Sequence, residues 1–201
     1  MTNKNMAELS GVISSVFEEC YSYGKEVFYK AILQVERMSG TYDEVPIVVS
    51  GNMLASEDYT NEFVYVTGDV RTYNKRNEDG SNSLIVHIFC KSFEVDADVD
   101  KGINVINLHG FICKGPYERV TPLGREITDF VLAVNRKCGK SNYIPCIAWG
   151  RNAKAIGKLN CSSEIEVTGR FQSRNYVRYS TQEARVAYEI SVNALAIIDG
   201  K

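Results

Sequence analysis

The sequence predicts an all-β chain built from two tandem copies of one small unit, and three observations support this. The two halves of the 201 residues align almost end to end, at a spacing of about 100 residues. Each half consists of short runs of β-branched and aromatic residues, separated by turn residues. A single stretch, NAKAIGKL from Asn152, has the pattern of a short helix.

The internal repeat is clearest in three blocks, which follow one another in the same order in both halves. NMAELSGVI from Asn5 matches NVINLHGFI from Asn104 at its Asn, Leu, Gly and Ile positions. AILQVERMSG from Ala31 falls on FVLAVNRKCG, and VPIVVSGN from Val45 falls on IPCIAWGR, with proline and glycine kept in place. A Val-Thr-Gly triplet then recurs at residues 66–68 and 167–169. The chain is therefore a duplication of one fold.

Each unit is predicted to contain five strands with a short helix between the third and fourth. This content suits the OB-fold, a Greek-key barrel whose exposed sheet face binds oligonucleotides, although a five-stranded unit of another topology is the alternative. We expect the units to cover residues 1–100 and 101–201, with the acidic segment EVDADVDKG as a solvated connection between them.

The composition is that of a folded globular protein, with 44% hydrophobic and 24% charged residues. No segment has the run of about 18 apolar residues that a membrane helix needs, so we expect a bacterial cytoplasmic protein without a membrane partner. The six cysteines are scattered without a CxxC pair, and only two histidines are present. We expect reduced, mostly buried thiols, no metal site and no cofactor.

The two halves differ in charge. Residues 1–100 hold 8 Lys and Arg against 17 Asp and Glu, while residues 101–201 hold 15 against 8. A polyanion should therefore bind chiefly to the second unit, because phosphate neutralisation supplies most sequence-independent affinity. Docking of the halves, or of two chains, is the alternative use of the opposite charges.

The segment EIEVTGRFQSRNYVRYS from Glu164 alternates with a period of two, so its residues sort onto the two faces of a strand. One face carries Ile165, Val167, Gly169 and Phe171 and belongs to the core. The other carries Arg170, Gln172, Arg174, Tyr176 and Arg178. Guanidinium groups beside an aromatic ring suit single-stranded nucleic acid, which offers phosphates and unpaired bases. A solvated strand face is the alternative interpretation.

The segment NYIPCIAWGR is apolar on both faces. Tyr143, Pro145, Ile147 and Trp149 share one face, opposite Ile144, Cys146 and Ala148. Tyr143 and Trp149 therefore lie on an open aromatic platform beside the basic strand, or Trp149 belongs to the core. We favour the platform.

The segments NVINLHGFI, TPLGREITDFVLAVNR, IPCIAWGRNAKAIGKL and VTGRFQSRNY, taken together, resemble the bacterial single-stranded DNA-binding protein family over nearly all of residues 103–198. The resemblance implies an OB-fold that binds single-stranded DNA without sequence preference. It places three of the family's stacking rings on Tyr143, Trp149 and Tyr176, whereas a fourth has no aromatic counterpart near Cys138.

The first unit resembles the family only faintly. Glu44 stands where Tyr143 does and Ser50 where Trp149 does, so we expect this unit to be a weaker binder or a scaffold. The nucleic-acid contacts that we expect across both units are Tyr143, Trp149, Arg151, Arg170, Arg174, Tyr176, Arg178, Arg136, Arg119, Arg71, Tyr73 and Lys75.

The resemblance implies protection of single-stranded DNA in replication, recombination and repair, and a homodimer with four OB-folds. The family's acidic, aromatic tail tip is missing from the end of this sequence, IIDGK, so we expect replication or repair proteins to be recruited in another way. An OB-fold adaptor, or an accessory protein of the primosomal restart type, is the alternative function, and RNA is an alternative ligand. No nucleophile elbow, phosphate-binding glycine loop or paired catalytic histidines are present, so we do not expect an enzyme.

Overall fold

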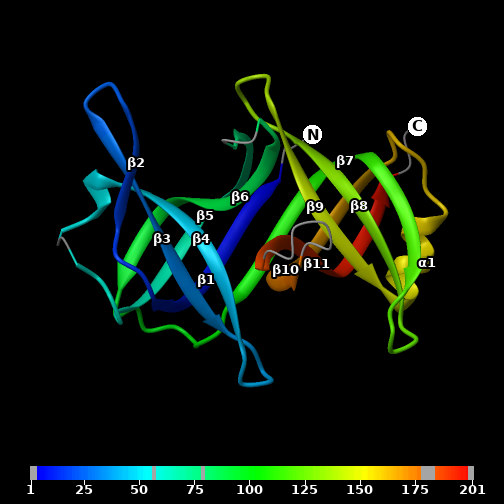
Figure 1. Cartoon of the computed structure of the whole chain (residues 1–201), viewed down its shortest axis with the longest axis horizontal. Helices are drawn as coiled ribbons and strands as arrows, with labels where there is room; N and C mark the ends of the chain where they lie inside the picture. Colours follow the sequence, from blue (N-terminus) through cyan, green and yellow to red (C-terminus); the bar gives the residue numbers. More distant parts are fainter. Residues whose placement is uncertain (1–3, 56–57, 78–79, 178–183, 199–201) are drawn as a thin grey trace.

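The computed structural model describes residues 4–55, 58–77, 80–177 and 184–198. It shows two β-barrels side by side, with the first strands of the two units next to each other at the centre (Figure 1). Both barrels belong to one eleven-stranded sheet within the described residues. The all-β tandem architecture predicted from the repeat is confirmed.

The first unit is formed by the strands β1 (Asn5–Ile13), β2 (Glu18–Tyr23), β3 (Glu26–Glu36), β4 (Tyr42–Ser50), β5 (Phe63–Arg76) and β6 (Asn82–Val95). Strand β1 pairs with both β3 and β5, and a short parallel pairing of β4 with β6 closes the barrel. The short strand β2 extends outwards as a hairpin with the beginning of β3.

The second unit is formed by β7 (Asn104–Val120), β8 (Glu126–Asn135), β9 (Ser141–Trp149), the helix α1 (Gly150–Gly157), β10 (Glu164–Val177) and β11 (Ala184–Ile198). Here β7 pairs with both β8 and β10, and β9 runs parallel to β11. The β7–β10 and β9–β11 pairings repeat those of β1–β5 and β4–β6, as a duplication requires.

Antiparallel pairing of β1 with β7 joins the units, so the backbones of the two barrels are hydrogen-bonded to each other. Leu9 and Leu108, which the repeat aligns, are both fully buried. Two glycines of the second barrel permit close strand contact: a Cβ added at Gly110 or Gly169 would lie 2.3 or 2.4 Å from a neighbouring carbonyl oxygen.

Three expectations need correction. The first unit has only a three-residue 3-10 turn, η1 (Gly51–Met53), where the second has α1, because α1 packs Ala153 and Ile156 into the core and the aligned segment becomes acidic after Leu54. The first unit also has six strands, since its first strand is interrupted before β2. Finally, the thiols are not mostly buried: only those of Cys90 and Cys146 are, whereas Cys20, Cys113, Cys138 and Cys161 are exposed.

In the described part of the chain α1 is the one α-helix, and neither its length nor its composition would let it cross a bilayer. Nor do the described residues bring three or more His, Cys, Asp or Glu side chains together in an arrangement that could hold a metal ion.

Candidate nucleic-acid interface

Strand β10 sorts its side chains as the period of two predicts, except that Gln172, expected on the outer face, is buried. Ile165, Val167 and Phe171 are buried in the second barrel, while Arg174 and Tyr176 are exposed on the opposite face. Tyr176 is 39% exposed, and its ring centroid lies 5.9 Å from the guanidinium carbon of Arg174. A ring and a cation therefore lie side by side at the open end of this strand.

Strand β9 supplies the other two predicted rings. Tyr143, at its beginning, is 53% exposed. Trp149, at its end, is half-buried, and its indole Nε1 donates a hydrogen bond of 3.1 Å to Ser191 Oγ on β11. The barrel core is filled from the opposite face of β9, by Ile144, Cys146 and Ala148. The structure thus places Trp149 outside the barrel core, on the Tyr143 face of the strand.

A groove of about 590 Å³, lined by Tyr176 among the three predicted rings, involves both units. Pro145, Tyr176 and Tyr188 line it from the second unit, and the beginning of β6, residues 82–86, lines it from the first. An extended polymer with flat bases would find aromatic and apolar surface here.

Two arginines on the same side of the second barrel are accompanied by carboxylates. Arg119 on β7 donates two hydrogen bonds to Asp129 on β8, one of them 3.1 Å long. Arg174 lies 3.7 Å from the carboxylate of Glu189 on β11. Burial raises the pKa of Glu189 above its ordinary value, although Arg174 acts in the opposite direction. The second unit is basic overall, but part of this charge is neutralised on the face itself.

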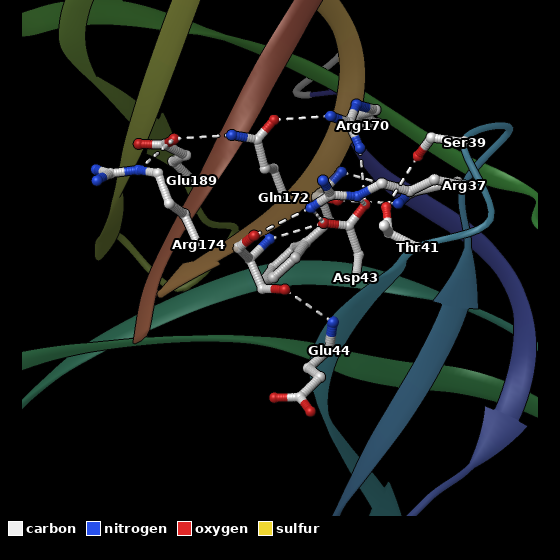
Figure 2. A network of polar contacts seen from close by, with 12 residues as sticks. Arg37, Ser39, Thr41, Asp43, Glu44, Arg170, Gln172, Arg174 and Glu189 are labelled. Carbon is white, nitrogen blue, oxygen red and sulfur yellow. Dashed lines mark hydrogen bonds and ion pairs between the residues drawn. The ribbon is translucent and has the colours of Figure 1, made fainter. Parts of the chain in front are cut away.

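Arg170 has a different environment from the one expected, because it is used in docking the two units (Figure 2). Its Nη1 donates a 2.7 Å hydrogen bond to Asp43 on β4 of the first unit, and its Nη2 donates to Gln172. The same carboxylate accepts from Arg37 and from the backbone N–H of Ser173. The side chain of Asp43 is 1% exposed. The opposite charges of the halves thus serve docking at this point.

The basic residues of the first unit lie on the equivalent face of its own barrel. The Arg71 guanidinium lies 3.4 Å from the Phe89 ring centroid, Tyr73 is 53% exposed, and Lys75 is exposed near the end of β5. Arg136, which follows β8 of the second unit, lines a groove of about 380 Å³ on this first-unit face. The sequence grouped Arg136 with the second unit, but the structure brings it to the first.

Three aromatic side chains of this first-unit face were missed. Tyr21 stacks on Phe28 with centroids 4.7 Å apart and planes at 17°, and Phe28 lies 5.6 Å from Phe89. The signal in the sequence was the hairpin pattern EECYSYGKEVFYK, in which Gly24 separates two runs that contain aromatic residues. The repeat alignment concealed it, since β2 has no separate counterpart in the second unit.

Of the two remaining predicted contacts, only Arg151 lies in the described part of the chain. Arg151 is exposed in the first turn of α1, two positions after Trp149. Arg178 lies outside the described residues.

His87, on β6 at the bottom of the first-unit groove, has its pKa lowered to about 4 by burial first and then by Arg71 and Arg136. At pH 7 it is neutral in the folded and the unfolded chain. Below about pH 6.5 the unfolded chain takes up a proton that the folded chain accepts only near pH 4. The free energy of unfolding therefore decreases by about 3 kcal/mol as the pH is lowered from about 6.5 to about 4. We expect His87→Gln to make the free energy of unfolding less dependent on pH between 6.5 and 4 in urea titrations. Equal slopes in both proteins would contradict this.

Comparison with known proteins finds relatives of the second unit. The model of the "Single-strand binding protein family" matches residues 103–198. Single-stranded DNA-binding protein A of Bacillus subtilis is 32% identical over 106 residues, which are 49% of this chain and 61% of that protein. Single-stranded DNA-binding protein 1 of Lactococcus lactis is 33% identical over 91 residues, 42% of this chain and 61% of that protein. This chain thus spans less than two thirds of the length of these curated relatives.

A solved structure extends the likeness to both units. The wild-type single-stranded DNA binding protein from Thermus aquaticus superposes with a TM-score of 0.74 at 19% identity, covering 100% of this chain and 96% of that one. A deletion mutant of the same protein gives a TM-score of 0.77 at 18% identity, with 99% and 96% covered. At these identities the likeness concerns the fold, and it includes the order of the two barrels in one chain.

Proposed function

We propose that this chain, whose second unit matches the single-strand binding protein family over residues 103–198, binds single-stranded DNA without sequence preference, mainly on the face formed by β9, β10 and β11. Single-stranded DNA binding is the activity named for the curated relatives. The binding details, and the protection of DNA during replication, recombination and repair, are part of the proposal.

The observation that carries this proposal is the exposure of aromatic rings at both ends of one sheet face. Tyr143 and Tyr176 are 53% and 39% exposed, and Trp149 is half-buried on the same side. Rings in such positions are costly to leave in water and can stack on unpaired bases, each stacked base contributing about 1–3 kcal/mol. Stacking does not depend on sequence, because every base has a flat face.

Competition between nucleic acids tests the proposal. The full chain should bind a labelled oligothymidine of about 30 nucleotides, and unlabelled single strands of mixed sequence should compete with equal strength. Duplex DNA should compete weakly, because its bases are stacked on each other. Equal competition by duplex would contradict base stacking and leave only binding by charge. Preferential competition by RNA of the same sequence would mean that RNA is the ligand.

Arg174 should contribute one phosphate contact, since its side chain is 50% exposed and its carboxylate partner is 3.7 Å away. We expect Arg174→Ala to lower the slope of log affinity against log salt concentration by about 0.7, the value for one phosphate of a single strand. Lys158→Ala, which removes an exposed charge after α1, is the matched control. An unchanged slope for Arg174→Ala would remove this strand face from the binding surface.

From the family resemblance we also propose that the chain forms a homodimer and acts in bacterial DNA processing. The adaptor alternative would show itself in the same competition assay, as weak affinity that does not increase with oligonucleotide length. Sedimentation of the free chain gives its oligomeric state directly.

A further inference from the structure

The groove of about 380 Å³ on the first unit has the composition of a nucleotide site, although this unit is the acidic one. Its walls carry Tyr21 and Tyr73, both exposed, and the guanidinium groups of Arg71 and Arg136. Aromatic surface and cations therefore occur together here, as they do on the second unit.

The groove lies at one of two contacts between the units that the internal repeat makes equivalent. At the first contact, Ser173 N donates to Asp43 and Glu44 N donates to Ser173 Oγ. At the second, Thr72 N donates to Asn142 Oδ1 and Tyr143 N donates to Thr72 Oγ1. Asn142 thus takes the place of Asp43, and the two contacts differ by one carboxylate.

This difference determines whether the arginine six positions before Asp43 or Asn142 has a carboxylate partner. Arg37 and Arg136 begin equivalent turns, closed by N–H to carbonyl bonds of 2.8 and 2.7 Å to Thr41 and Lys140. Arg37 is neutralised by Asp43. Among the described residues Arg136 has no carboxylate within ion-pair distance, and the Nδ2 of Asn142 is buried without a hydrogen-bond partner.

The second arginine of the groove is also poorly compensated. Arg71 lies 3.9 Å from Asp69, whose carboxylate is already bonded to Lys91. Burial and then the proximity of Arg136 lower the pKa of Arg71. Two cations in a partly desolvated groove repel each other, and this repulsion destabilises the free protein. An anionic ligand would relieve the repulsion.

We propose that this groove binds a nucleotide of single-stranded nucleic acid, with its phosphate on Arg71 and Arg136 and its base against the exposed ring of Tyr21 or Tyr73. The site needs both units, because Arg136 belongs to the second. Phe28 and Phe89 support it from below: Tyr21 stacks on the first and the Arg71 guanidinium on the second. A planar base has the same ways of stacking on a ring or a guanidinium.

This inference rests on the proposed function, because it extends the path of the same bound strand. Tyr143 of the second unit is hydrogen-bonded through its backbone N–H to Thr72, the neighbour of Tyr73 in the first. A strand on the Tyr143 face can therefore continue across the contact onto Tyr73. The first unit would then bind DNA through Tyr21, Tyr73 and the groove arginines, in place of the aromatic residues that it lacks at the Tyr143 and Trp149 positions.

The substitution Asn142→Asp tests the inference without removing any cation. It should recreate at Arg136 the ion pair that Asp43 makes with Arg37, and so neutralise the groove. For an oligothymidine of about 30 nucleotides, we expect a lower affinity and a salt slope smaller by about 0.7. For one of about 8 nucleotides, within the range of a single OB-fold, the quenching of Trp149 on the second unit should be unchanged. Lys101→Ala, which removes an exposed charge beside the other contact, is the control.

A folded Asn142→Asp variant with the salt slope of the wild type would overturn the inference. If circular dichroism shows that this variant is unfolded, Arg136→Gln takes its place, and a wild-type salt slope in that variant would overturn the inference. Failure of the proposed function would look different. In that case the wild-type protein would bind neither oligonucleotide, and the inference would fail as well. Tyr73→Ala adds a reading that is independent of charge. Loss of one stacked base should weaken binding of the long oligonucleotide by about 5- to 150-fold.

Discussion

Replacing Asp43 by alanine is expected to lower the free energy of unfolding by about 3–5 kcal/mol, the usual cost of removing one partner from a buried ion pair. The carboxylate is almost fully buried and accepts hydrogen bonds from Arg37, Arg170 and the Ser173 N–H. The substitution leaves two arginines and a backbone donor without this partner (Figure 2). Urea denaturation of the full chain measures the loss.

Asp43→Asn is the informative companion, because it copies the arrangement that Asn142 has at the equivalent contact. It keeps an acceptor for the Ser173 N–H while removing the charge, so its destabilisation should be smaller than that of the alanine variant. A loss below about 1 kcal/mol for Asp43→Ala would mean that the contact between the units does not depend on this ion pair.

The largest expected effect on binding is that of the triple variant Tyr143→Ala, Trp149→Ala, Tyr176→Ala. If each ring stacks on one base, and the losses add, affinity for single-stranded DNA should fall by about 3–9 kcal/mol. Tyr143 and Tyr176 are exposed, so their removal should leave the barrel folded. Filter binding at low salt, with circular dichroism to confirm folding, measures the result.

The matched control is an exposed tyrosine away from the proposed path. Tyr23, at 81% exposure, lies at the end of β2 and does not line the first-unit groove. Tyr23→Ala should keep wild-type affinity. A folded triple variant that also keeps it would show that the aromatic face is not the binding surface.

The architecture could be predicted from the sequence because its main signals are local or periodic. The duplication gave the number of barrels, and the period of two gave the faces of β9 and β10. Burial in the structure follows that assignment at Phe171 and Ile144 on one side and at Arg174 and Tyr143 on the other.

The electrostatics of the site could not be predicted in the same way, because they depend on how the units meet. Arg170 is on the predicted face but is held by Asp43, which lies 127 positions away in the chain. Arg136 belongs to the basic half yet lines a groove of the acidic half. Net charge per unit describes long-range attraction, whereas the local potential is set by pairings that a charge count does not contain.

The first unit shows the same limit for aromatic residues. The alignment with the second unit places Glu44 and Ser50 at the Tyr143 and Trp149 positions, and so indicates only that the first unit has no rings there. The rings that the first unit does present, Tyr21 and Tyr73, come from β2 and β5. An alignment can report the loss of a residue but not its replacement from another strand.

The central claim, that single-stranded DNA binds on the aromatic face of the second unit, is tested most directly by the fluorescence of Trp149, the only tryptophan. Oligothymidine of about 8 nucleotides would be titrated into the full chain at low and at high salt. Binding on this face predicts strong, saturable quenching, with an affinity that falls as salt rises. Tight binding measured by anisotropy of a labelled oligonucleotide, with the Trp149 emission unchanged, would place the DNA elsewhere and contradict the account.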